Sequence, residues 1–204
     1  MMTHINVLLR QVAVNEVIKG PWAGVDAGVL KLLEMNKQVT YAYGDFDSVN
    51  VNELKKIRKT IDLDIVPSEK DYTDSELALL DLRDKGYQTI DVYGALGGRL
   101  DHELINIQLL NHPKLRDLSI HLRNDKNDIC LLTSGHHELS ASQKQYVSFI
   151  PLYDETLISL EGFKYDIKDR YINIGESLTV SNEFTGNTAR LTTNQNILMI
   201  NSTD

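Results

Sequence analysis

Short apolar runs alternate with helix-like patterns over roughly the first 124 residues, and this alternation narrows the possible folds more than any other feature. The runs that we expect to be strands are Val7–Leu9, Ala23–Val25, Tyr41–Tyr43, Ile65–Val66 and Ile90–Tyr93. Strands that alternate with helices form a mostly parallel sheet that is covered on both faces. The pattern therefore predicts an α/β domain.

Helical periodicity marks the segments between these runs. The expected helices are one with the apolar face Leu54, Ile57 and Ile61, one from Asp74 to Lys85, and one that begins near Asp101 and ends before Asn111. The second is the most clearly marked, because Thr73 and Glu76 have the spacing of a capping box. Gly86 follows it as a typical C-terminal stop.

The pattern changes in the polar stretch that begins at Asn124. The short β-like runs beyond it are Ile129–Thr133, Gln145–Ile150, Leu157–Leu160, Ser177–Val180, Thr188–Leu191 and Ile197–Ile200. Gly, Asn and Asp residues punctuate them, and no helical pattern lies between them. We therefore predict an α/β domain over residues 1–126 and a smaller antiparallel, sandwich-like all-β domain over residues 127–204.

Bulk properties exclude several classes of protein. The net charge of −8 is unfavourable for binding nucleic acid, which requires a dense Lys and Arg surface. The single cysteine, Cys130, lies in an apolar run and is expected to be a buried residue in a reducing compartment. No stretch is long enough for a signal-peptide core or a membrane span, so we expect a cytoplasmic protein without a membrane partner.

Two acidic residues, Asp45 and Asp47, follow the expected strand Tyr41–Tyr43 in the motif Gly44-Asp45-Phe46-Asp47-Ser48. Alternate residues of an extended chain point the same way, so both carboxylates are expected to project beyond the carboxyl edge of the sheet. Open α/β sheets bind ligands at that edge, and Mg²⁺ prefers oxygen ligands of this kind. Gly, Asp and Ser are also common in turns, so the motif alone is compatible with a simple turn.

A second acidic motif, Asp71-Tyr72-Thr73-Asp74, opens the capped helix. Taken alone, Asp74 is explained by its interaction with the positive end of the helix dipole, which contributes about 0.3–1 kcal/mol. Asp45 and Asp47 on the neighbouring loop change this interpretation. Four carboxylates at one sheet edge repel each other unless a cation is bound there, and a cation site is therefore expected.

A glycine-rich motif, Gly94-Ala95-Leu96-Gly97-Gly98-Arg99-Leu100-Asp101-His102, connects a strand to a helix. Backbone N–H groups of such a loop can hold phosphate oxygens at the start of a helix, and arginine adds a planar cation that binds phosphate. Asp101 either caps the helix or holds ribose, metal or water. The motif is neither the dinucleotide-binding glycine pattern nor the P-loop, because no Gly-Lys-Ser/Thr occurs in the chain.

Taken together and in this order, the three motifs resemble those of the thiamine pyrophosphokinase family. Further similar segments are Gly24-Val25-Asp26-Ala27-Gly28, Gly162-Phe163-Lys164-Tyr165 and Ser181-Asn182-Glu183-Phe184. The resemblance spans roughly residues 20–200. It departs after the first strand, where the family has a glycine-rich turn and this chain continues as Leu9-Arg10-Gln11-Val12.

The resemblance implies a transfer of pyrophosphate from ATP to the hydroxyl group of thiamine, with release of AMP. It implies Asp45, Asp47, Asp71 and Asp74 as catalytic, Mg²⁺-binding carboxylates; Asp26, Gly97, Gly98, Arg99, Asp101 and His102 as ATP-binding residues; and Ser181 and Asn182 as thiamine-binding residues. It also implies a homodimer with active sites between subunits. The residue that stacks on thiamine stays open between Phe184 and a tyrosine, whereas Trp22 is expected to be a packing residue.

Two alternative functions remain at this point. Asp45-Phe46-Asp47-Ser48 also resembles the nucleophile loop of haloacid-dehalogenase-type phosphatases, although that loop normally follows the first strand. A non-catalytic sensor of nucleotide or thiamine is the other alternative, and the full set of carboxylates argues against it.

Overall fold

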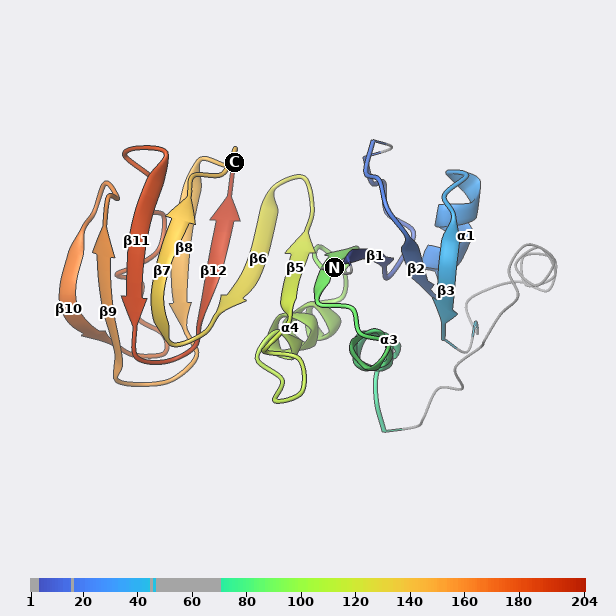
Figure 1. Cartoon of the computed structure of the whole chain (residues 1–204), viewed down its shortest axis with the longest axis horizontal. Coiled ribbons are helices and arrows are strands. Elements are labelled where there is room, and N and C mark those ends of the chain that lie inside the picture. The colour runs from blue at the N-terminus through green and yellow to red at the C-terminus, as the bar shows by residue number, and fades with distance from the viewer. Residues whose placement is uncertain (1–3, 16, 45, 47–70) are drawn as a thin grey trace. The chain divides into compact units, whose positions relative to one another are not determined.

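The structure is a computed structural model that describes residues 4–15, 17–44, 46 and 71–204. It divides into two compact units, residues 1–124 and residues 125–204, which we call unit 1 and unit 2 (Figure 1). Asp45, Asp47, the expected strand Ile65–Val66 and the expected helix around Leu54, Ile57 and Ile61 lie outside the described residues.

Unit 1 contains a parallel sheet. Its strands are β1 (His4–Leu8), β2 (Trp22–Val25), β3 (Val39–Tyr43), β4 (Thr89–Tyr93) and β5 (Ser119–Arg123). They lie in the order β3-β2-β1-β4-β5, and every pair of neighbours is parallel. The prediction of a mostly parallel α/β sheet is confirmed.

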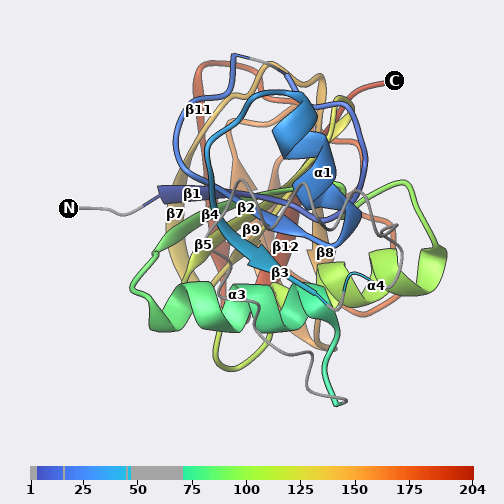
Figure 2. The same cartoon turned by 90° about the vertical axis from the view of Figure 1, so that its right-hand side faces the viewer.

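Helices cover both faces of this sheet. They are α1 (Ala27–Glu34), α3 (Asp74–Asp84) and α4 (Leu100–Leu109). Figure 2 shows α1 on one face and α3 with α4 on the other. Of the helices that the structure describes, none combines the length and the apolar character needed to cross a bilayer.

The signals at the ends of α3 are those predicted from the sequence. Thr73 is the N-cap, and its hydroxyl oxygen accepts a hydrogen bond of 3.2 Å from the backbone N–H of Glu76. Gly86 follows the C-cap with a φ of +90°, a backbone conformation that glycine adopts without steric cost. The carboxyl group of Asp74 therefore stands at the very beginning of the helix.

Packing around Trp22 joins the strands of unit 1 to α1. Trp22 is 1% exposed and forms an apolar cluster with Leu8 and Leu32. Its ring lies 5.6 Å from that of Tyr93, measured between centroids. Trp22 is therefore a packing residue, as predicted.

Unit 2 consists of antiparallel strands. They are β6 (Asn127–Leu132), β7 (Gly135–Ser140), β8 (Tyr146–Pro151), β9 (Thr156–Glu161), β10 (Ile167–Ile172), β11 (Thr188–Thr193) and β12 (Ile197–Ser202). One group of neighbours runs β6-β12-β8 and a separate sheet runs β10-β9-β11-β7. Both contribute to one apolar cluster, in which Phe149 of β8 and Leu191 of β11 are fully buried. The prediction of an antiparallel, sandwich-like fold is confirmed.

The expected strand Ser177–Val180 is wrong, because this segment forms a turn. The N–H of Val180 donates a hydrogen bond of 3.1 Å to the carbonyl oxygen of Ser177 within the segment itself. Thr179 alone is buried, and its N- and C-terminal neighbours Leu178 and Val180 are 52% and 43% exposed. This alternation of exposed and buried side chains imitates the pattern of a strand.

Candidate functional site

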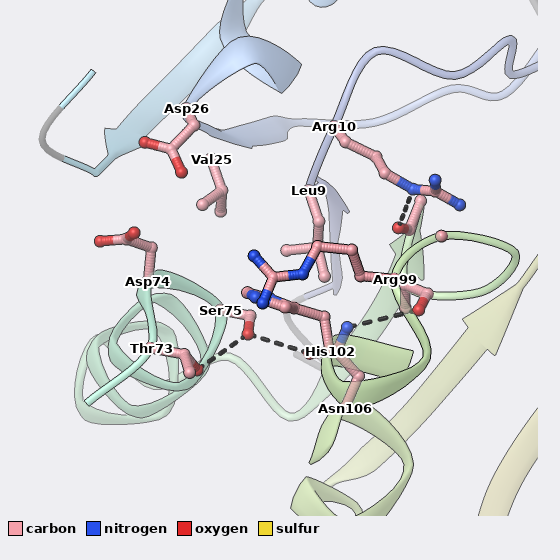
Figure 3. A pocket seen from close by; sticks show the side chains of 13 residues that line it. Leu9, Arg10, Val25, Asp26, Thr73, Asp74, Ser75, Arg99, His102 and Asn106 are labelled. Atoms are coloured by element: carbon pink, nitrogen blue, oxygen red, sulfur yellow. Dashed lines mark hydrogen bonds between the residues drawn. The ribbon is translucent and has the colours of Figure 1, made fainter. Parts of the chain in front are cut away.

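A cavity of about 410 Å³ opens at the carboxyl edge of the unit 1 sheet (Figure 3). Its walls come from the segments that follow β1, β2 and β4 and from the beginning of α3. The chain order of the strands reverses at β1, since β2 and β3 lie on one side of it and β4 and β5 on the other. Such a reversal is where open α/β sheets bind ligands.

Asp26 forms one wall of the cavity directly after β2. Its backbone N–H donates a hydrogen bond of 2.9 Å to the carbonyl oxygen of Tyr43, which anchors it to the end of β3. A Cβ atom at Gly44 would stand 2.0 Å from Oδ1 of Asp26, and Gly44 has a φ of +115°. Only glycine fits there, so the first residue of the motif Gly44–Ser48 is packed against the Asp26 carboxylate.

Asp74 forms the neighbouring wall. It is half-buried at the start of α3 and lines the cavity, whereas Asp71 is exposed in the preceding turn and does not. Figure 3 shows the carboxylates of Asp26 and Asp74 on one side of the cavity, with Arg99 and His102 reaching in from the other. Opposite charges therefore face the same space.

The donor set is suited to a hard cation. Within the described residues, no group of three His, Cys, Asp or Glu side chains could hold a metal ion. Asp45 and Asp47 lie outside that part of the chain. Asp26 and Asp74 nevertheless present carboxylate oxygens to one cavity, and these are the ligands that Mg²⁺ prefers.

Arg99 and Asp101 form an exposed ion pair in which Nη2 of Arg99 lies 2.6 Å from Oδ2 of Asp101. The hydrogen bond raises the pKa of Arg99 and holds the pKa of Asp101 below its usual value. Oδ1 of Asp101 also accepts a hydrogen bond of 2.9 Å from the backbone N–H of His102 in the first turn of α4. Arg99 and His102 line the cavity, and Asp101 does not.

The glycine-rich loop itself lies beside the cavity. Gly98 lines it, whereas the N–H of Gly97 donates a hydrogen bond of 2.9 Å to Oε2 of Glu103. The carboxylate of Glu103 thus occupies a backbone donor that is predicted to bind phosphate.

Sequence reasoning assigned no role to Arg10 or Ser75, and both line this cavity together with Asn106. Arg10 lies just beyond the carboxyl end of β1, which is the same position in the fold that drew attention to the loops after β3 and β4. Asn106 lies on α4, four residues after His102. Its side chain is buried and bonded to both Ser75 and the carbonyl oxygen of Ala95.

In unit 2, two segments that resemble the family, Gly162–Tyr165 and the predicted thiamine segment Ser181–Phe184, lie next to each other. Asn182 is 2% exposed; its Nδ2 donates to the carbonyl oxygen of Tyr165 at 2.9 Å, and its Oδ1 accepts from the Tyr165 N–H at 3.0 Å. Nζ of Lys164 lies 2.6 Å from Oε1 of Glu183, and this hydrogen bond raises the pKa of Lys164. Ser181 is exposed at the same turn, with a φ of +57°. Asn182 thus holds the two segments together through backbone groups.

Family models match both parts of the chain. The model described as "Thiamin pyrophosphokinase, catalytic domain" matches residues 19–122. The model described as "Thiamin pyrophosphokinase, vitamin B1 binding domain" matches residues 136–198.

Similar proteins carry the same name. Thiamine pyrophosphokinase of Bacillus subtilis (strain 168) is 36% identical over 187 residues, which cover 90% of this chain and 87% of that protein. The crystal structure of thiamine pyrophosphokinase from Bacillus subtilis superposes with a TM-score of 0.91 at 32% identity, covering 98% of this chain and 99% of that one. That of thiamin pyrophosphokinase from Geobacillus thermodenitrificans has a TM-score of 0.88 at 32% identity, with 98% of each chain covered.

Proposed function

The chain belongs to the thiamine pyrophosphokinase family, and from this premise we propose that the cavity of unit 1 binds ATP and that unit 2 supplies the thiamine-binding residues. The reaction of this enzyme class transfers pyrophosphate from ATP to the hydroxyl group of thiamine, which gives thiamine diphosphate and AMP. The observation that carries the proposal is the cavity itself. It brings the predicted residues Asp26, Asp74, Gly98, Arg99 and His102 together from separate loops.

The chemistry requires little beyond positioning and neutralisation of charge. The alcohol oxygen of thiamine forms a bond to the β-phosphorus of ATP. The bond between that phosphorus and the bridging oxygen of the α-phosphate breaks, the electron pair leaves with AMP, and the alcohol proton is released. We propose that Arg99 and the N–H groups of Gly97 and Gly98 bind the phosphate oxygens, with Asp26, Asp101 and His102 completing the ATP site. For this the N–H of Gly97 exchanges the carboxylate of Glu103 for a phosphate oxygen.

We propose Mg²⁺ as the cofactor, held by Asp74 together with Asp45, Asp47 and Asp71. When bound there, the ion would supply positive charge that offsets the negative charge of the phosphate groups. The support from the described residues is that Asp74 faces the cavity and that Gly44 brings the beginning of the Asp45 loop against Asp26. An ordinary aspartate is a weak base at neutral pH, so Asp71 or Asp74 is proposed to orient the alcohol instead of deprotonating it.

For thiamine, we propose Ser181 and Asn182 as the binding residues. The support is that the turn carrying them lies against Tyr165, since Asn182 bonds both backbone polar groups of that residue. Ser181 is the exposed member of the pair, whereas Asn182 acts by fixing the turn. Phe184 follows Asn182 by two residues, and Tyr165 contacts this turn through its hydrogen bonds with Asn182.

Self-association as a homodimer, with active sites between subunits, is also proposed. Large apolar side chains are exposed on both units, among them Leu100 and Leu104 on α4, and Tyr171 and Ile174 in unit 2. Leu100 and Leu104 are four residues apart on one helix, and neighbouring exposed apolar side chains of this kind can form part of an interaction surface. The buried free thiol of Cys130 fits a reducing compartment, and we propose the cytoplasm.

The decisive experiment incubates the protein with thiamine, ATP and Mg²⁺ and detects thiamine diphosphate and AMP in equal amounts. ADP as the product would contradict the proposal. Binding of both substrates without AMP would indicate a sensor, and a trapped aspartyl-phosphate would indicate the phosphatase alternative.

A further inference from the structure

Arg10 is bound to the glycine-rich loop by its side chain. Its Nε donates a hydrogen bond of 2.7 Å to the carbonyl oxygen of Gly94, and its Nη2 donates to the carbonyl oxygen of Leu96. Arg10 is half-buried just after β1, and the residues it binds are more than eighty positions away in the sequence. Figure 3 shows its guanidinium group turned toward the loop, whereas that of Arg99 extends into the cavity.

The glycines of the loop fit closely around this side chain. A Cβ atom at Gly98 would stand 2.7 Å from Nη1 and 3.0 Å from Cζ of Arg10. At Gly94, which has a φ of +79°, a Cβ atom would stand 3.0 Å from Cγ of Arg10. Glycine at these two positions is therefore explained by contact with Arg10, in addition to any approach of a ligand.

The contacts have an electrostatic consequence for a phosphate ligand. Carbonyl oxygens repel phosphate, and the carbonyl groups of Gly94, Ala95 and Leu96 are all engaged by side chains, the middle one by Nδ2 of Asn106 at 3.3 Å. Arg10, which also lines the cavity, places a full positive charge against the loop. In a partly dry site such a fixed charge favours a bound anion.

We propose that Arg10 is a positioning residue for ATP, which holds the loop Gly94–Gly98 in place and adds positive potential at the wall of the cavity. The inference rests on the proposed function of the cavity. Arg10 stands after β1, where this chain has no glycine-rich turn. In this role Arg10 contacts the loop backbone, and Arg99 contacts the phosphates.

The test compares Arg10→Ala and Arg10→Lys with the wild type by calorimetric titration with Mg²⁺ and a non-hydrolysable ATP analogue. Loss of two charge-assisted hydrogen bonds is expected to weaken binding by about 10- to 100-fold in Arg10→Ala, with a smaller loss in Arg10→Lys. In turnover, KM for ATP should rise while KM for thiamine stays unchanged. Arg83→Met, which removes a half-buried arginine of α3 that does not line the cavity, is the matched control and should bind nucleotide normally.

Two further readouts separate loop positioning from a general structural role. Hydrogen exchange over residues 94–98 should accelerate in Arg10→Ala without nucleotide. In the wild-type background, Gly98→Ala should weaken binding of the ATP analogue strongly. In the Arg10→Ala background the same substitution should weaken binding less, because the guanidinium group that clashes with the new Cβ atom is gone.

Binding of the ATP analogue at wild-type affinity by Arg10→Ala would overturn the inference, even if the enzyme turns over as proposed. If Arg10→Ala does not fold, unchanged binding and exchange in Arg10→Lys would overturn it in the same way. Failure of the proposed function looks different, because the wild type itself would then neither bind the analogue nor release AMP.

Discussion

The hydroxyl of Ser75 donates a hydrogen bond of 2.9 Å to Oδ1 of Asn106, and this bond joins the first turn of α3 to the middle of α4. Asn106 is 7% exposed, and its Nδ2 donates to the carbonyl oxygen of Ala95 at 3.3 Å. One buried amide thus links the helix that begins with Asp74 to the glycine-rich loop. A shift of either element is passed to the other through this side chain.

Replacement of this amide by a side chain of similar size, Asn106→Leu, should lower both stability and activity. The carbonyl oxygen of Ala95 would lose its side-chain donor, and the hydroxyl of Ser75 would keep only its contact of 3.1 Å with Oγ1 of Thr73. We expect a cost of about 1–3 kcal/mol in the free energy of unfolding. Urea titration measures this cost. The kcat/KM for ATP should also fall, because α3 and the glycine-rich loop are no longer held in position relative to each other. Gln108→Leu, at an exposed position of the same helix, is the control. Equal stability of the two variants would contradict the assigned role.

Asp74→Asn should keep the fold and lose most of the turnover. The substitution removes a carboxylate that faces the cavity, while it leaves the Thr73 cap in place. Its cost in stability should stay near the dipole contribution of about 0.3–1 kcal/mol. Thermal unfolding and steady-state kinetics at several Mg²⁺ concentrations measure the two effects. Asp84→Asn removes the same charge from the other end of α3 and should leave turnover intact. Near-native turnover in Asp74→Asn would remove Asp74 from the mechanism.

Much of unit 1 could be predicted because its signals are local. The cap at Thr73, the stop at Gly86 and the apolar run of β4 each depend on residues that are close in the sequence. Once strands and helices alternate, the carboxyl edge of the sheet follows from the handedness of their connections. Asp74 could therefore be expected at that edge from the local pattern, whereas the role of Asp26 came only from the resemblance to the family.

The parts of the fold and of the candidate site that could not be predicted depend on contacts between residues far apart in the sequence. Arg10 is identified only by its partners after β4, and a single arginine after a strand has no signature of its own. In unit 2, β7 was not predicted because its sequence lacks an apolar run. Most of its residues are polar, among them His136, His137 and Glu138. β10 was missed for a similar reason, since most of Ile167–Ile172 is exposed and a register shift interrupts its pairing with β9.

Gly44→Ala should reduce both stability and affinity for ATP. The new Cβ atom would stand 2.0 Å from Oδ1 of Asp26, and the φ of +115° is unfavourable for alanine. Backbone strain alone costs about 1–3 kcal/mol. Gly86→Ala measures the cost of backbone strain alone, because Gly86 has a φ of +90° and a new Cβ atom there would meet nothing within 4 Å. Both variants should lose stability in urea, but only Gly44→Ala should raise KM for ATP. An unchanged KM in Gly44→Ala would show that the position of Asp26 does not matter.

Tyr43 should make the protein sensitive to alkaline pH. It is 1% exposed, and its hydroxyl donates a hydrogen bond of 2.7 Å to Oδ2 of Asp81. Burial is the main cause that raises the pKa of Tyr43 far above its usual value, and the bond to Asp81 adds to it. Tyr87 is affected in the same direction, since burial and a hydrogen bond to Tyr41 raise its pKa to about 12.

The sign of the effect follows from comparing the folded and unfolded chains. Below pH 10 Tyr43 is protonated in both, so its contribution to stability is fully present. Above that value the unfolded chain releases the proton and the folded chain retains it, which favours unfolding by about 1.4 kcal/mol per pH unit. Tyr43→Phe should therefore be less stable than the wild type at pH 8, because the bond to Asp81 is lost, yet lose stability less steeply between pH 10 and about 11.5. Urea titrations across this range measure both slopes. Tyr72→Phe, at a 43% exposed position, is the control and should retain the wild-type slope. Parallel curves for the wild type and Tyr43→Phe would show that the buried hydroxyl does not govern the alkaline transition.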